Sequence, residues 1–104
     1  MTTSHVATLA TRQARARAVR NVSTSQVILV ADDLVVATAT CTLTLPAVAV
    51  ATGQVVTVKM TSASTVTIDG NGSETIDGAL TRDLTVQYEA VTLICDGSQW
   101  LEVV

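Results

Sequence analysis

The residues best suited to chemistry form one dense stretch, DGNGSETIDG at positions 69–78, with two aspartates, a glutamate, an asparagine and three glycines. Oxygen-bearing side chains at its first, third and fifth positions match the start of a calcium-binding loop. The sixth position is Glu74, where an EF-hand requires glycine, and the twelfth is Leu80, where it requires a bidentate glutamate. The spacing excludes an EF-hand, and we expect no metal site here.

The same stretch could supply a pair of carboxylates for acid–base catalysis, namely Glu74 and Asp77. Such a pair needs surroundings that separate the two pKa values, and the neighbouring residues are not apolar enough for that. Asp-Gly and Asn-Gly pairs tolerate positive φ angles and are strong hairpin signals. The stretch 69–78 is therefore predicted to be a tight double turn between two strands.

No other set of residues suggests an enzyme. His5 is the sole histidine, and no Ser-His-Asp set or phosphate-binding glycine pattern is recognisable. Cys41 and Cys95 are interpreted as small buried hydrophobic residues, and a disulfide between them would require neighbouring strands. We therefore expect no catalytic residues, no metal and no cofactor.

The elements around these residues read as short strands. The apolar residues are mostly Val, Ala, Leu and Ile, threonine is abundant, and there is no Phe, one Tyr and one Trp. Such a composition favours a pleated sheet. In the segment 40–46, Cys41 and two leucines alternate with threonines, as expected for a strand with one buried face.

Strand signals recur every eight to twelve residues or so, with turn residues between them. This spacing predicts a single all-β domain, an antiparallel β-sandwich or jelly-roll-like body over residues 26–104. A short helix fits within 47–52, and Trp100 is expected to be a partly buried strand residue. The predicted strands are 26–31, 34–39, 40–46, 55–60, 64–69, 79–87, 90–97 and 99–104.

Residues 1–25 are predicted to form an N-terminal basic arm, extended or partly helical. Residues 1–31 contain four arginines and no acid, whereas residues 32–104 contain two basic residues and nine acids, a net charge of −7. This division indicates that the arm docks on an acidic surface, such as a neighbouring copy. No aromatic residues accompany the arginines, so nucleic acid is not expected, and no apolar run is long enough to cross a membrane. The candidate partner-binding residues are Arg12, Arg15, Arg17 and Arg20.

Several motifs resemble a small β module of tailed-bacteriophage virion proteins, which include capsid decoration (cement), tail fibre and tailspike proteins. They are TLTLPAV at 42–48, VVTVKM at 55–60, TVTIDGNGSETIDG at 65–78 and LTVQYEAVTLICDGSQWLEV at 84–103. The similarity covers about residues 27–104. This sequence departs from the pattern at Gly70, where the module often has proline, and in its arginine-rich arm.

The resemblance implies a sandwich or jelly-roll-like body with a structural role in a virion, often as a trimer, and brings no catalytic residues. We expect a capsid decoration protein, assembled in the host cytoplasm, that binds the major capsid protein and neighbouring copies on the outside of a phage head, as a homotrimer. The alternative is a tail-associated or receptor-binding module. Copy number separates the two, because decoration needs hundreds of copies per particle.

Overall fold

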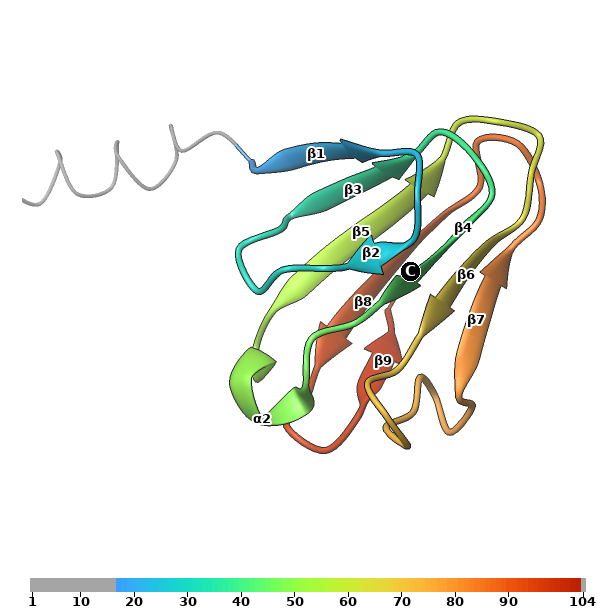
Figure 1. Ribbon diagram of the computed structural model, residues 1–104. Helices are drawn as coiled ribbons and strands as arrows, with labels where there is room; N and C mark the ends of the chain where they lie inside the picture. The colour runs from blue at the N-terminus through green and yellow to red at the C-terminus, as the bar shows by residue number, and fades with distance from the viewer. Residues whose placement is uncertain (1–16, 104) are drawn as a thin grey trace, which may run out of the picture.

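The computed structural model describes residues 17–103, which form two β-sheets and one short helix, α2 (Val48–Ala51) (Figure 1). The first sheet has the strand order β1 (Val19–Val22), β3 (Leu34–Ala37), β5 (Val55–Met60), β8 (Ala90–Cys95) and β9 (Trp100–Glu102). The second has the order β2 (Gln26–Val27), β4 (Cys41–Thr44), β6 (Val66–Asp69) and β7 (Thr81–Leu84). The predicted all-β class is confirmed, and α2 lies where the sequence predicted a short helix.

The expected antiparallel arrangement is wrong, because both sheets are mixed. β1, β3 and β5 run parallel to one another, and so do β2, β4 and β6. The cause is the path of the chain, which crosses to the other sheet after each strand from β1 to β5, so each return to a sheet is in the same direction. Among the strands of residues 17–103, the antiparallel pairs are β5–β8, β6–β7 and β8–β9. The regular spacing of strands along the sequence therefore does not show that consecutive strands pair as hairpins.

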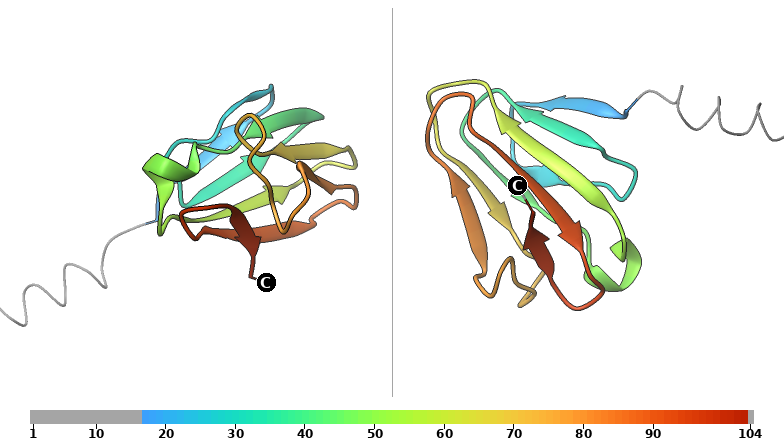
Figure 2. Two further views of the ribbon diagram at one scale, coloured as in Figure 1. Left: turned by 90° about the horizontal axis from the view of Figure 1, so that it is seen from below. Right: turned by 180° about the vertical axis from the view of Figure 1, so that it is seen from behind.

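The two sheets share one core. Alternate residues of β5 (Val56, Val58, Met60) are buried, as the period of two along a strand requires. Cys41 and Leu43 in β4 are buried and Thr42 is exposed, which confirms the predicted alternation. All the buried apolar side chains of both sheets belong to a single cluster. Figure 2 shows the two sheets as two layers.

Trp100 is wholly buried, not partly buried as expected. It lies opposite Cys95 in the β8–β9 pair, and Ile76 of the 69–78 turn pairs with it from the other side. Its indole Nε1 donates a hydrogen bond to the Pro46 carbonyl oxygen, at 3.3 Å. The aromatic ring thus has a polar partner inside the core, as a buried tryptophan requires.

The sheet region begins before the predicted boundary between residues 25 and 26. β1 pairs in parallel with β3 along its whole length, from Val19 beside Leu34 to Val22 beside Ala37. Val22 is buried in the core, so β1 is part of the body. The rest of the predicted arm, residues 1–16, lies outside the described residues.

Candidate functional site

The stretch 69–78 is a turn between β6 and β7, as predicted. The amide of Gly70 donates to the Leu80 carbonyl at 3.1 Å, and the amide of Glu74 donates to the Asn71 carbonyl at 3.0 Å. Gly72 has a φ of 58°, a value that residues with a side chain rarely adopt. Turn geometry therefore accounts for the glycines in this stretch.

Gly70 is required at its position for a second reason. A Cβ atom there would lie 2.1 Å from the carbonyl oxygen of Glu74, far inside contact distance. A proline would add this clash and remove the amide that bonds to Leu80. The turn conformation seen here is thus incompatible with the proline that the resembled phage module often has at this place.

The carboxylates of this turn bind backbone amides. Glu74 Oε1 accepts a hydrogen bond from the amide of Val48 at the start of α2, at 3.1 Å. Asp77 Oδ1 accepts one from the amide of Glu102 in β9, also at 3.1 Å. They tie the turn to two different neighbours and do not converge on one point. Among residues 17–103, no group of three or more His, Cys, Asp or Glu side chains is placed to hold a metal ion.

The structure separates the four candidate arginines. Arg12 and Arg15 lie outside the described residues. Arg17 has a side chain that is 71% exposed, and its guanidinium is 3.7 Å from the Asp33 carboxylate. Arg20 lies in β1 and is only 29% exposed. The described arginines therefore differ in how far they are available to a partner.

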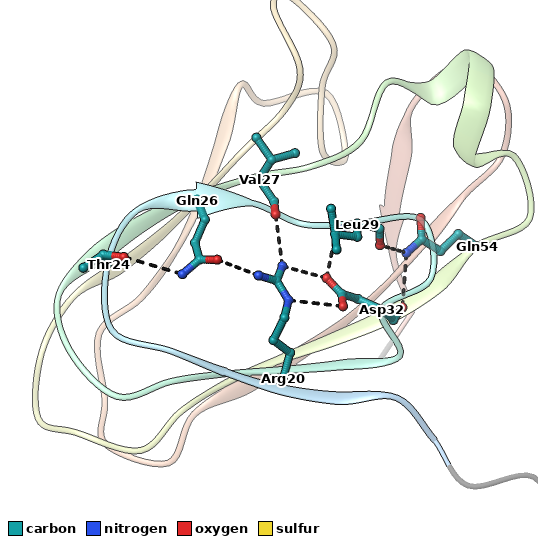
Figure 3. A network of polar contacts seen from close by, with 7 residues as sticks. All are labelled: Arg20, Thr24, Gln26, Val27, Leu29, Asp32 and Gln54. Carbon is teal, nitrogen blue, oxygen red and sulfur yellow. Dashed lines mark hydrogen bonds and ion pairs between the residues drawn. The ribbon is translucent and has the colours of Figure 1, made fainter.

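Arg20 bridges the two sheets at one of their open sides (Figure 3). Its Nη2 donates to Asp32 Oδ2 at 2.8 Å and its Nε to Asp32 Oδ1 at 3.3 Å. The same guanidinium donates to Gln26 Oε1 and to the Val27 carbonyl, both in β2. Because β1 and β2 are the outermost strands of their sheets at this side, Arg20 holds them together. It is an internal brace, a role that sequence reasoning missed.

Asp32 is the buried acid that anchors this brace. It is 6% exposed, and besides Arg20 it accepts a hydrogen bond from the Leu29 amide at 2.8 Å. Gln54 Nε2 donates to the carbonyls of Leu29 and Asp32, at 2.9 and 3.2 Å. In the sequence, Asp32 stands out only by its position directly after the apolar run 26–31. That position does not reveal that Asp32 pairs with Arg20.

Arg82 bridges the sheets at the opposite side, where β7 and β9 are the outermost strands. Its Nε donates to Glu102 Oε2 at 3.0 Å and its Nη2 to Glu102 Oε1 at 3.3 Å, and Glu89 lies 3.5 Å away. The hydrogen bond with Arg82 lowers the pKa of Glu102 below its ordinary value. The amides of Thr85 and Val86, and then Arg82, lower the pKa of Glu89. Both open sides of the two-sheet body are thus closed by an arginine and carboxylates.

No protein-family model matches the sequence, and no curated protein matches it either. The resemblance to the phage module therefore rests on the quoted motifs. No helix among residues 17–103 is long and apolar enough to span a membrane.

Two hollows lie beside Arg17, of about 430 and 390 Å³. Both are lined by Arg17, Asp33 and Val55. The first continues over Val30, Val50 and the end of α2, and the second over Leu34, Thr57 and Thr92. Asp33 already accepts a hydrogen bond from the Ala18 amide at 2.8 Å and faces Arg17. The first hollow is largely polar, since Asp32 and Gln54 also line it, whereas the second is mainly apolar. Neither lining contains a nucleophile with an adjacent base.

Cys41 and Cys95 are buried free thiols, as the sequence interpretation held. They lie in β4 and β8, which belong to different sheets. Burial raises the pKa of the Cys41 thiol, and the Cys95 thiol donates to the Val48 carbonyl at 3.6 Å. A buried thiol of raised pKa is a packing residue, not a nucleophile.

Proposed function

We propose that this protein is a structural virion component, a non-enzymatic capsid decoration (cement) protein whose body is a β-sandwich. The observation that carries the proposal is the use made of charged side chains. Asp32, Arg20 and Arg82 hold the two sheets together, and Glu74 and Asp77 tie the 69–78 turn to its neighbours. A protein whose charged side chains mainly hold its two sheets and its turn together is suited to a mechanical role on a capsid shell.

The charge division supports docking by the N-terminal segment. The described region, residues 17–103, contains four basic residues and nine acids, a net charge of −5, while Arg12 and Arg15 lie ahead of it. Because Arg20 is bound internally, the docking set narrows to Arg12, Arg15 and Arg17. Each exposed ion pair contributes less than about 1 kcal/mol, so useful affinity depends on many copies and on apolar burial.

A tail-associated or receptor-binding role is the second candidate. It is favoured by the exposed connection between β7 and β8, where Val86 is 65% and Tyr88 60% exposed. An exposed aromatic ring at the tip of a connection suits recognition of a protein or glycan. The ring of Tyr88 also lies 5.8 Å from Lys59 Nζ. This tip would be the contact surface of a receptor-binding module.

Counting copies in purified particles tests the proposal. Quantitative mass spectrometry of the phage that carries this gene should find hundreds of copies per particle, in heads separated from tails. A few to a few dozen copies in the tail fraction would support the second candidate, and absence from particles would overturn both.

Docking is tested with the full-length protein. The double variant Arg12→Ala/Arg15→Ala should stay folded but bind undecorated heads at least about tenfold more weakly, because it loses ion pairs in every copy. Gln13→Ala is the matched control, since it changes the same segment without removing a charge. Equal binding by the double variant and the wild type would refute docking by this segment.

A further inference from the structure

The outer face of the five-stranded sheet is apolar, although a strand face in water is usually polar. The outward residues are those that alternate with the buried ones along each strand, and most are branched hydrophobic side chains. They are Val19, Leu34, Val36, Val55, Ile94 and Leu101, with Val103 just beyond β9. We call this surface the apolar face, and the right-hand view of Figure 2 is from its side.

The outward polar residues of this face are Asn21, Thr57, Lys59 and Thr92, and the last three make hydrogen bonds within the molecule. The hydroxyls of Thr57 and Thr92 lie opposite each other and share a hydrogen bond of 2.9 Å. Lys59 is the last residue but one of β5, and its Nζ donates to the Tyr88 carbonyl at 3.1 Å. Asn21 is exposed on β1, the outermost strand, so a partner that covers the middle of the face can leave the Asn21 amide at the rim, in water.

The outer face of the four-stranded sheet differs sharply. Its outward positions carry Val27 in β2 but otherwise polar residues, which are Thr42 and Thr44 in β4, Thr67 and Asp69 in β6, and Thr81 and Asp83 in β7. Hydroxyls and carboxylates suit a surface that stays in water. The contrast between the two faces of one small body indicates that only the first is built to be covered.

We propose that the apolar face binds the same face of a second copy of this chain. The described region has a net charge of −5, so two copies repel unless their contact excludes the acids. Association through the other sheet would set Asp69 and Asp83 against their counterparts. The apolar face has no outward carboxylate along its strands, and Asp33 at its rim is opposed by Arg17.

The size of the face sets the expected strength. Five strands about 4.8 Å apart, each with about five residues at about 3.3 Å, give a patch of roughly 24 by 16 Å, about 400 Å² in projection. A standard interface buries about 800 Å² per partner. The hollow lined by Leu34, Val55, Thr57 and Thr92 lies within this patch. Association should therefore be concentration-dependent and at the weaker end for specific contacts.

This inference rests on the proposed function, because a decoration protein is expected to bind neighbouring copies of itself. It adds the surface through which two copies would bind. Its test uses purified full-length protein without shells. A failure here would leave docking by Arg12 and Arg15 untouched, and a failure to find the protein in particles would leave self-association untouched.

Sedimentation velocity over a wide concentration range measures the association. The wild type should form dimers as concentration rises, because a contact between the same face of two copies leaves no face free for a third. Val55→Lys places a charge on the middle strand of the face, at a residue 42% exposed, and should weaken association at least about tenfold, because a buried unpaired ammonium is costly. Val27→Lys is the matched control, since Val27 is 53% exposed and lies on the other sheet. It should associate as the wild type does.

Wild-type protein that stays monomeric at every concentration would overturn the proposal. So would a Val55→Lys variant that associates normally, or a Val27→Lys variant that loses association equally. Unchanged emission of buried Trp100 verifies that each variant is folded. If Val55→Lys does not fold, Val19→Lys is the replacement, because Val19 is 58% exposed on the same face.

Discussion

Replacing Asp32 by alanine should destabilise the protein more than any other single change to a charged side chain of the brace at β1 and β2. Asp32 accepts two hydrogen bonds from Arg20 and one from the Leu29 amide, and it is 6% exposed. The substitution leaves the Arg20 guanidinium without its carboxylate and the Leu29 amide without its acceptor. Both groups are then poorly solvated.

The magnitude follows from burial. Breaking a fully buried ion pair costs about 3–5 kcal/mol, while an exposed pair contributes about 0–1 kcal/mol. The Arg20 side chain is 29% exposed and that of Asp32 is 7% exposed, which places this pair between the two limits. We expect Asp32→Ala to lower the free energy of unfolding by about 2–4 kcal/mol, and Arg20→Met, which keeps the aliphatic stem, by about 2 kcal/mol.

Urea unfolding followed by Trp100 fluorescence measures these losses, because Trp100 is the single tryptophan and is fully buried in the folded protein. All variants are compared at one protein concentration. In the double variant the two losses should not add, and the coupling energy should be about 1–2 kcal/mol. Arg17→Ala is the control and should change stability by less than about 0.5 kcal/mol, since its side chain is 71% exposed.

A loss for Asp32→Ala no larger than that for Arg17→Ala would refute the reasoning. It would mean that the contacts at the β1 edge do not hold the sheets together. Additive losses in the double variant would refute the direct pairing of Arg20 with Asp32.

Three further outcomes are expected. Gly70→Ala should lower the unfolding free energy by about 1–3 kcal/mol in urea, because the new Cβ meets the Glu74 carbonyl, and wild-type stability would contradict this. Arg82→Met should flatten the acid loss of stability, chiefly through Glu102, because the hydrogen bond with Arg82 lowers the folded pKa of Glu102, whereas the amides of Thr85 and Val86 still lower that of Glu89. The stabilising contribution is present above the ordinary pKa of 4.5 and is lost as pH falls below it, so an unchanged slope of stability between pH 6 and about 3 would contradict the bridge. Cys41 and Cys95 should resist a thiol reagent in the native protein and react fully in denaturant, whereas rapid native labelling would contradict their burial.

Local patterns predicted the strands well where one face is buried and the other is not. The segment 55–60 was predicted as a strand, and β5 spans those residues. Its buried residues Val56, Val58 and Met60 alternate with residues that are exposed or partly exposed. The 69–78 turn was predicted from the tolerance of glycine for positive φ angles, which is confirmed at Gly72 and Gly78, whereas Gly70 is required by its close approach to the Glu74 carbonyl. These are properties that neighbouring residues determine among themselves.

The pairing of strands could not be read from the same patterns. Parallel and antiparallel neighbours both bury alternate residues, so alternation does not reveal direction. β1 was assigned to the arm because its four residues, VRNV, include one arginine and one asparagine and have no clean alternation. Its place in the sheet depends on β3, fifteen positions later, and on the partner that Asp32 gives to Arg20. The sequence patterns do not reveal long-range contacts of this kind, so they predicted neither the place of β1 in the sheet nor the internal role of Arg20.

The crossing path of the chain has a consequence for how the protein is made. β5 pairs with β8, and in that pair Val55 lies opposite Ile94, 39 positions later. During synthesis β1, β3 and β5 emerge long before the strand that completes their sheet. The nascent chain must carry unpaired strand edges and an uncovered core until β8 arrives, and pairings between distant segments form slowly. Folding should therefore be a late, concerted event, and a ribosome-bound chain that ends before Ala90 should remain sensitive to protease.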